Sequence, residues 1–182
     1  MNSFFKWFLS LFERGIDYAN TDVELPKEEE KQEVKEEESI MSKYERLDKP
    51  YRLSKSGEER LNQCCKDIQT VIREVLYYRD ISILCGYRSN EEQEMMYKQK
   101  TSKARAGQSA HNYKPSLAID VVPYPIPKKN DAWDSDSEEW QKLCDLIMDI
   151  AKDKGIELEW GGNWKSLVDK PHYEIKDWKN KK

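Results

Sequence analysis

The sequence predicts an α+β fold, with a small antiparallel sheet flanked by helices in a single compact domain that carries an N-terminal extension. Short apolar patterns typical of strands are interspersed with amphipathic helix patterns, without the regular strand–helix–strand repeat of a parallel sheet. Prolines and glycines punctuate these segments and keep the expected strands short. We therefore expect one α+β domain over residues 43–182.

The first half of this domain shows two helix starts and one buried strand. Ser56-Gly-Glu-Glu59 is a capping box, and apolar residues at helical spacing follow it, which predicts one helix ending near Arg79. The segment Ile81–Cys85 is expected to be a short buried strand. Ser89-Asn-Glu-Glu92 is a second capping box that opens another helix, and residues 100–108 are expected to form a polar loop.

The second half contains three strand patterns and one long helix. A strand is expected over residues 117–122, where the following proline cluster ends it. Residues 138–154 predict an amphipathic helix, with Gly155 at the position after its C-terminus. The last two strands are expected over residues 156–160 and 172–175.

The N-terminal extension has two parts with different compositions. Residues 1–20 predict an amphipathic, Phe-rich helix that binds either a membrane surface or a partner protein, and packing on its own domain is an equal alternative. Residues 21–42 predict an acidic linker, because nine acidic and three basic residues lie between Asp22 and Glu38. The extension has no stretch long enough to cross a bilayer, and it lacks the features of a Sec signal peptide.

Charge and cysteine content exclude several classes of protein. The formal net charge is −4, so the dense basic surface of a nucleic-acid-binding protein is not expected. No two cysteines form a C-x-x-C pair, and each lies in an apolar pattern. We interpret them as small buried residues of a protein folded in a reducing compartment: Cys64, Cys65, Cys85 and Cys144.

The only two histidines, His111 and His172, indicate a metal site. His111 lies just before the strand that carries Asp120, and strand alternation directs His172 and Glu174 to the same face. If the two strands pair near Asp120, three ligands converge. Two imidazoles and one carboxylate leave a fourth zinc position open, which is typical of a catalytic site.

A hydrolytic site also needs a proton acceptor. Asp169, which Pro171 holds close to His172, is the first candidate for a general acid/base. Glu174 is the reserve candidate and Glu159 a weaker one, while each carboxylate has a surface charge as its alternative.

A developing oxyanion needs a fixed positive charge, and Arg88 is the best candidate. Its alternative is an arginine at a helix start, paired with Glu91 or Glu92.

Several separated motifs resemble one known family. The sequence resembles the zinc D-alanyl-D-alanine carboxypeptidases and dipeptidases, and especially their phage branch, the L-alanyl-D-glutamate endopeptidases that act as endolysins. The resemblance covers residues 43–175 and rests on these segments: Gly86-Tyr-Arg-Ser89 with Gln93, Ser109-Ala-His111, Ala118-Ile-Asp120, Glu159-Trp-Gly-Gly-Asn-Trp164 and Asp169-Lys-Pro-His172.

The resemblance implies a role for each candidate residue. His111, Asp120 and His172 match the Zn²⁺ ligands, Asp169 matches the catalytic acid/base, and Arg88 matches the arginine that holds substrate or transition state. The sequence departs from the family in the loop between the first two ligands, where Lys114-Pro115 is inserted and Ser116 replaces a glycine. This insertion is expected to alter the rim of the substrate site without removing the metal.

The expected function is a zinc-dependent hydrolase that cleaves the L-alanyl-D-glutamate bond of the peptidoglycan stem peptide. The resemblance implies a phage-encoded enzyme of cell-wall lysis or penetration, made in the host cytoplasm without a Sec signal. Residues 1–20 would attach it to a virion protein or a membrane surface. Two alternatives stay open: a D-alanyl-D-alanine carboxypeptidase, and a catalytically inactive module similar to the hedgehog branch of the family.

Overall fold

The computed structural model describes residues 42–180. The predicted helix of residues 1–20 and nearly all of the predicted linker of residues 21–42 lie outside the described residues. Within the described range, no helix combines the length and the apolar character that a membrane span requires.

The first predicted helix is two helices, α3 (Lys55–Asn62) and α4 (Lys66–Val75), so the prediction of one continuous helix was wrong. The chain breaks at Cys65 because backbone groups there bond to a distant segment. The Cys65 N–H donates to the Ser116 carbonyl at 2.9 Å, and the Ser116 N–H donates to the Gln63 carbonyl at 2.8 Å. These long-range hydrogen bonds replace those that would continue the helix.

Local signals set the other helix ends. Ser54, not Ser56, caps α3, because its hydroxyl accepts from the Gly57 N–H at 3.1 Å. The second capping box is confirmed at the start of α5 (Asn90–Lys98). The long predicted helix is α6 (Glu139–Asp153), and Gly155 follows it with a φ of +66°, as the glycine after a helix terminus commonly does.

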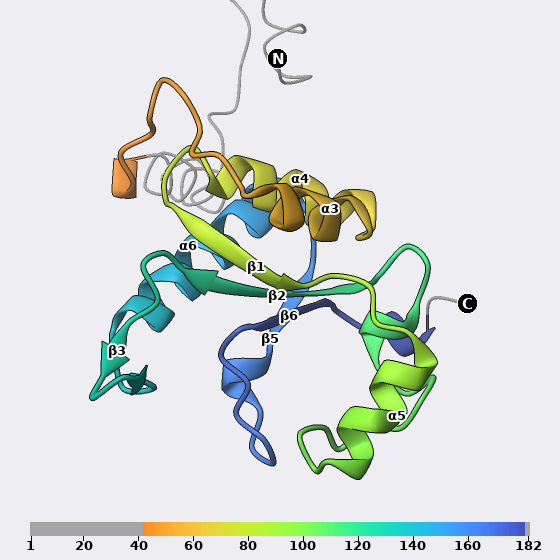
Figure 1. Cartoon of the computed structure of the whole chain (residues 1–182). Helices are drawn as coiled ribbons and strands as arrows, with labels where there is room; N and C mark the ends of the chain where they lie inside the picture. The colour runs from red at the N-terminus through yellow and green to blue at the C-terminus, as the bar shows by residue number, and fades with distance from the viewer. Residues whose placement is uncertain (1–41, 181–182) are drawn as a thin grey trace, which may run out of the picture. The chain divides into compact units, whose positions relative to one another are not determined.

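A four-stranded antiparallel sheet forms the centre of the domain (Figure 1). The strand order is β1-β2-β6-β5, so the last strand in the sequence pairs between β2 and β5. The predicted strands are confirmed with small changes at their ends: β1 is Ile81–Cys85, β2 Ala118–Pro123, β5 Leu158–Trp160 and β6 His172–Ile175.

A short hairpin was not predicted from the sequence. Strands β3 (Lys128–Lys129) and β4 (Ala132–Trp133) pair around Asn130 and Asp131, whose φ angles are +50° and +64°. Two central residues with positive φ are typical of the tight turn that matches the twist of a hairpin. Strands of two residues are too short to show an alternating pattern.

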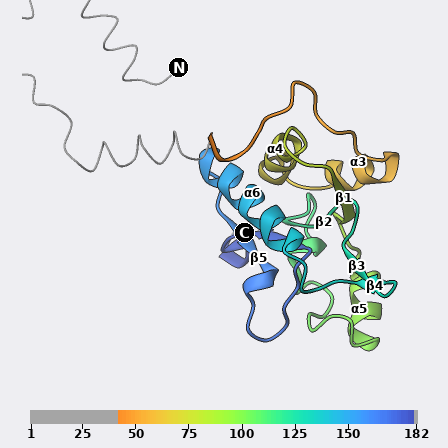
Figure 2. The same ribbon diagram turned by 90° about the vertical axis from the view of Figure 1, so that its left-hand side faces the viewer.

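Helices cover the sheet on one side. Helix α3 packs on β1, and α6 packs on α4, β2 and β5. Helix α5 lies apart from this group in both views (Figures 1 and 2). Short 3-10 turns complete the described chain: η2 is Ala110–Asn112, η3 Gly161–Asn163 and η4 Trp178–Asn180. The observed architecture is the predicted α+β fold, and its largest fully buried side chains include Tyr173, Leu61, Ile68, Ile72 and Ile119.

Candidate metal centre and cleft

Strand register brings three chemically active residues into one row across the sheet. Asp120 on β2 is paired with Cys85 on β1 and with His172 on β6. A register shift between Ile83 and Cys85 brings Cys85 opposite Asp120. His111 approaches the same place from η2.

Three polar atoms meet at this row. The Nε2 atom of His111 lies 3.1 Å from Oδ1 of Asp120, and that oxygen lies 3.1 Å from Nδ1 of His172. The two ring nitrogens are 3.2 Å apart. His111 and His172 are buried, so little water reaches these atoms. The structure therefore places together the three residues that the sequence predicted as metal ligands.

In each imidazole, the nitrogen that points away from Asp120 makes a hydrogen bond, and this bond determines the tautomer of the ring. Nδ1 of His111 lies 2.6 Å from the Gly86 carbonyl, which can only accept, so Nδ1 carries the proton. Nε2 of His172 lies 3.1 Å from a carboxylate oxygen of Glu174 and donates to it in the same way. Neutral rings in these tautomers direct two nitrogen lone pairs and one carboxylate oxygen toward a common point. Such outer hydrogen bonds are typical of histidines that bind metals.

The spacing of the three atoms fits zinc. A tetrahedral ion with Zn–N distances of about 2.0–2.1 Å has ligand atoms about 3.3 Å apart. The observed separations of 3.1 and 3.2 Å are close to this value. Three such donors would hold a divalent ion through His111, Asp120 and His172.

Electrostatics show how strongly the carboxylate and the rings are coupled. Burial raises the pKa of Asp120, but hydrogen bonds with both histidines dominate and hold that pKa well below its usual range. Burial lowers the pKa of His111, but its hydrogen bonds with Asp120 and Cys85 raise it to about 10. The pKa of His172 is also raised, because hydrogen bonds with Asp120 and Glu174 outweigh the effect of burial. A bare site therefore attracts protons strongly, and a bound cation would replace them.

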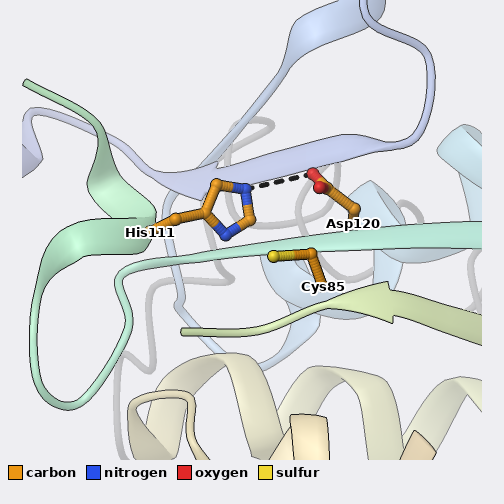
Figure 3. A group of neighbouring side chains, drawn as sticks. All are labelled: Cys85, His111 and Asp120. Carbon is orange, nitrogen blue, oxygen red and sulfur yellow. Dashed lines mark hydrogen bonds and ion pairs between the residues drawn. The ribbon is translucent and has the colours of Figure 1, made fainter. Parts of the chain in front are cut away.

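Cys85 is a neighbour that sequence reasoning missed. One donor atom each from Cys85, His111 and Asp120 lie within 4.8 Å of one another, and their side chains point toward a common centre (Figure 3). The Cys85 thiol donates to the Gly86 carbonyl at 3.7 Å and accepts from Arg88 at 3.7 Å. His172 forms the tighter set with His111 and Asp120, and Cys85 lies beside that set. The prediction of Cys85 as merely a small buried residue was incomplete, because its side chain is only partly buried and borders the site.

Asp169 lies on the cleft beside this centre. The His172 N–H donates to the Asp169 carbonyl at 3.2 Å, and the Asp169 N–H donates to the Gly161 carbonyl at 3.0 Å. Burial, and next the charge of Asp120, raise the pKa of Asp169 above its ordinary value. A carboxyl with a raised pKa transfers protons more readily near neutral pH.

Arg88 is held between the centre and the neighbouring loop. Its guanidinium lies 3.4 Å from Oδ2 of Asp120 and donates to Oε1 of Gln93 at 3.0 Å. Gln93 is fully buried and donates in turn to the Ser102 hydroxyl at 2.9 Å and the Ala104 carbonyl at 2.7 Å. The described contacts of Arg88 therefore differ from its alternative pairing with Glu91 or Glu92, and Gln93 links the arginine to the loop.

The two reserve carboxylates lie on neighbouring strands. Glu174 of β6 is directly opposite Glu159 of β5, and both line the cleft. The hydrogen bond of Glu174 to His172 gives it an orienting role, whereas within residues 42–180 the Glu159 carboxylate has no comparable hydrogen bond to a histidine. Strand alternation predicted this orientation of Glu174, although not its hydrogen bond.

The loop before β2 supports the site through hydroxyl hydrogen bonds. The Ser109 hydroxyl accepts from the His111 N–H at 3.3 Å and so fixes the turn of η2. Ser116 is buried, and its hydroxyl donates to the Ala118 carbonyl at 2.7 Å and lies 3.1 Å from the Gly86 carbonyl. Lys114, Pro115 and Ser116 are not among the residues that line the cleft, and the expected change of its rim relative to the family stays a prediction.

The cleft itself has a volume of about 540 Å³. Its floor contains the proposed metal ligands, Arg88 and Asp169. Two loops meet across it, because the Lys103 ammonium donates to the Ser166 carbonyl at 2.5 Å. Trp164 also lines the cleft and lies against the ring of His172, with centroids 4.9 Å apart.

Known proteins share this domain. Residues 102–175 match a family described as D-alanyl-D-alanine carboxypeptidase. Peptidoglycan L-alanyl-D-glutamate endopeptidase CwlK of Bacillus subtilis is 37% identical over 112 residues, which cover 53% of this chain and 60% of that protein. The crystal structure of the L-Ala D-Glu endopeptidase ChiX of Serratia marcescens matches with a TM-score of 0.58 and 29% identity, covering 72% of this chain and 95% of that chain.

These matches show that the domain is similar to peptidases. Residues 102–175 are thus similar to the D-alanyl-D-alanine carboxypeptidase family, and the α+β fold of the chain agrees with the ChiX structure. It spans 60% of the length of the curated relative that it matches.

Proposed function

We propose that the chain is a zinc-dependent peptidoglycan hydrolase that cleaves the L-alanyl-D-glutamate bond of the stem peptide. The observation that carries this proposal is the triangle of His111 Nε2, Asp120 Oδ1 and His172 Nδ1, with sides of 3.1 to 3.2 Å. Its two imidazoles are fixed by outer hydrogen bonds to Gly86 and Glu174. The triangle lies in a cleft of the size expected for a ligand site.

Each residue has a distinct task in the proposed reaction. A zinc ion bound by the triangle would lower the pKa of a bound water and polarise the scissile carbonyl. The Asp169 carboxylate accepts a proton from the attacking water and returns it to the leaving amine. Arg88 places a positive charge beside the reacting carbonyl.

The names of the two relatives favour the L-alanyl-D-glutamate bond, because both are endopeptidases for that bond. A D-alanyl-D-alanine carboxypeptidase is the alternative, in accordance with the family description. An inactive module is disfavoured, because Asp169 is retained at the cleft together with all three ligand candidates.

We propose further that the enzyme is phage-encoded and acts on the cell wall after synthesis in the host cytoplasm. Residues 1–20 would then be a helix that attaches it to a virion protein or a membrane surface, and residues 21–42 an acidic tether. The support for this part is the resemblance to phage endolysins and the composition of the extension.

Digestion of purified peptidoglycan tests the proposal. The zinc-loaded protein should release stem peptides with a new N-terminal D-glutamate, identified by mass spectrometry, while His172→Ala should release none. Release of free D-alanine would favour the carboxypeptidase instead. No new termini from zinc-loaded wild-type protein would favour the inactive module.

A further inference from the structure

A second groove adjoins the cleft, and the proposed reaction does not use it. Its volume is about 480 Å³. Asp169 and Pro171 line both the cleft and this groove, so the two adjoin at the proposed acid/base. We name it the Trp133 groove after its most exposed aromatic residue; its lining residues are Trp133, Ser135, Asp136, Trp140, Val168, Asp169, Lys170 and Pro171.

Trp133 is held in place although 47% of it is exposed. It ends the β3–β4 hairpin, and the Asp134 N–H extends the pairing by donating to the Pro127 carbonyl at 2.9 Å. Beneath it lies Trp140 of α6, only 3% exposed, with ring centroids 5.8 Å apart. The Trp140 indole N–H donates to the Asp134 carbonyl at 2.8 Å. The exposed indole is therefore a preorganised platform.

Polar groups border this platform. Ser135, Asp136 and Lys170 line the groove, and the Lys170 ammonium donates to the Ser135 carbonyl, joining the hairpin side to the segment that carries Asp169. An aromatic face bordered by hydroxyl, carboxylate and ammonium groups suits an amphipathic ligand. A pyranose ring is such a ligand, because its C–H face stacks on the electron-rich face of an indole and its edge carries hydroxyl and amide groups.

We propose that the Trp133 groove binds the N-acetylmuramyl sugar to which the stem peptide is attached. This inference rests on the proposed function, because in L-alanyl-D-glutamate cleavage a single alanine separates the scissile bond from the lactyl group of that sugar. One extended residue spans at most about 3.6 Å, so the sugar must lie next to the catalytic groups. A groove that Asp169 itself lines meets this requirement. In cleavage of a terminal D-alanine, the sugar would lie several residues further away.

Two substrates distinguish the contribution of the sugar to cleavage from that of the peptide. One is an N-acetylmuramyl peptide that begins with L-alanyl-D-glutamate, and the other is the same peptide with only an acetyl group in place of the sugar. The wild-type protein should cleave the muramyl peptide with a kcat/KM about 3- to 10-fold higher, the range expected from one aromatic contact. Trp133→Ala should remove this preference and leave kcat/KM for the acetyl peptide unchanged.

Two further variants control for the fold and for general exposure. Trp133→Tyr keeps an aromatic face and should keep the preference. Tyr124→Ala removes an aromatic side chain that is 60% exposed but lines neither the cleft nor the groove. It should leave kcat/KM unchanged for both substrates. Melting temperatures of all variants show whether the hairpin change unfolds the domain.

The outcomes distinguish the two proposals. If the wild-type protein cleaves neither substrate at this bond, the proposed function fails. If it cleaves both with equal kcat/KM, or if Trp133→Ala keeps the preference, the sugar site is wrong and the proposed function stands. Equal losses on both substrates in Trp133→Ala would mean that the groove holds peptide, which also overturns the sugar site.

Discussion

At the scale of single residues, His172 and Cys85 are rival donors beside the same carboxylate. Both are paired with Asp120 across the sheet, one from each neighbouring strand. His172 presents a ring nitrogen whose orientation Glu174 fixes, whereas the Cys85 thiol has weak contacts with Gly86 and Arg88 at 3.7 Å. The better oriented donor should hold the metal.

Removing each donor in turn tests this assignment. His172→Ala should lose most of the zinc that the wild-type protein keeps after dialysis, because only two ligands remain. Cys85→Ala should keep about one zinc per chain, because the triangle is intact. Zinc content by mass spectrometry and the melting temperature with and without zinc measure the effect. Loss of zinc in Cys85→Ala with retention in His172→Ala would transfer the site to the cysteine.

Substitutions of the two carboxylates near His172, Asp169 and Glu174, should affect the enzyme in different ways. Asp169→Asn removes the proton acceptor but no ligand, so zinc content should stay and kcat should fall about 10²- to 10⁴-fold. Glu174→Gln weakens the partner of His172 Nε2, so zinc affinity should fall about 10- to 100-fold, with activity recovering in excess zinc. Zinc titrations and kcat at saturating zinc separate the two effects. The reverse pattern would make Glu174 the acid/base.

At the scale of elements, the turn after β5 fixes where the catalytic segment lies. A Cβ atom added at Gly161 would lie 2.6 Å from the Asp169 carbonyl oxygen and 3.0 Å from the His172 Cβ. Only glycine therefore lets η3 approach the segment that carries both residues. This close approach explains Gly161, whereas a Cβ atom at Gly162 would lie 2.2 Å from the Trp160 ring.

Gly161→Ala should displace that segment. We expect a loss of about 1–3 kcal/mol in the free energy of unfolding, as in overpacked sites, and a fall in kcat/KM larger than this destabilisation alone would cause. Gly57→Ala is the control, since its nearest neighbour would be the Ser54 hydroxyl at 3.3 Å, far from the site in the fold. Denaturant unfolding and peptide kinetics check both. If Gly161→Ala had the kinetics of the wild-type protein, the segment that carries Asp169 and His172 would be able to shift without disturbing the site.

Local patterns predicted the elements that local forces form. The capping box at Ser89, the glycine after α6 and the alternation of β6 were readable because each depends on neighbouring residues. The break at Cys65 was not, because hydrogen bonds to Ser116 cause it. Cys85 was missed as part of the site for the same reason, since only the pairing of β1 with β2 places it opposite Asp120.

At the scale of the whole molecule, residues near the start of the described range already make tertiary contacts with the folded domain. The Tyr44 hydroxyl donates to Asp149 of α6 at 2.8 Å, and the Lys43 ammonium lies 3.0 Å from the same carboxylate. Burial, and next this hydrogen bond, raise the pKa of Tyr44 to about 12, so the hydroxyl stays protonated and keeps donating at physiological pH. Arg46 adds a contact over the Tyr77 ring at 3.8 Å.

Two truncations that differ by five residues therefore test the domain boundary predicted at residue 43. Removing residues 2–41 should leave the melting temperature and the hydrolysis of soluble muramyl peptide nearly unchanged, because every residue described for the site lies at or after position 84. Removing residues 2–46 should lower the free energy of unfolding by about 1–3 kcal/mol, because the partly buried Tyr44 and the Arg46 stacking are lost. The variant that lacks residues 2–46 should still hydrolyse the peptide at saturating zinc, at temperatures below its lowered melting temperature. Loss of activity on removal of residues 2–41 would mean that the extension belongs to the catalytic unit and is no independent tether.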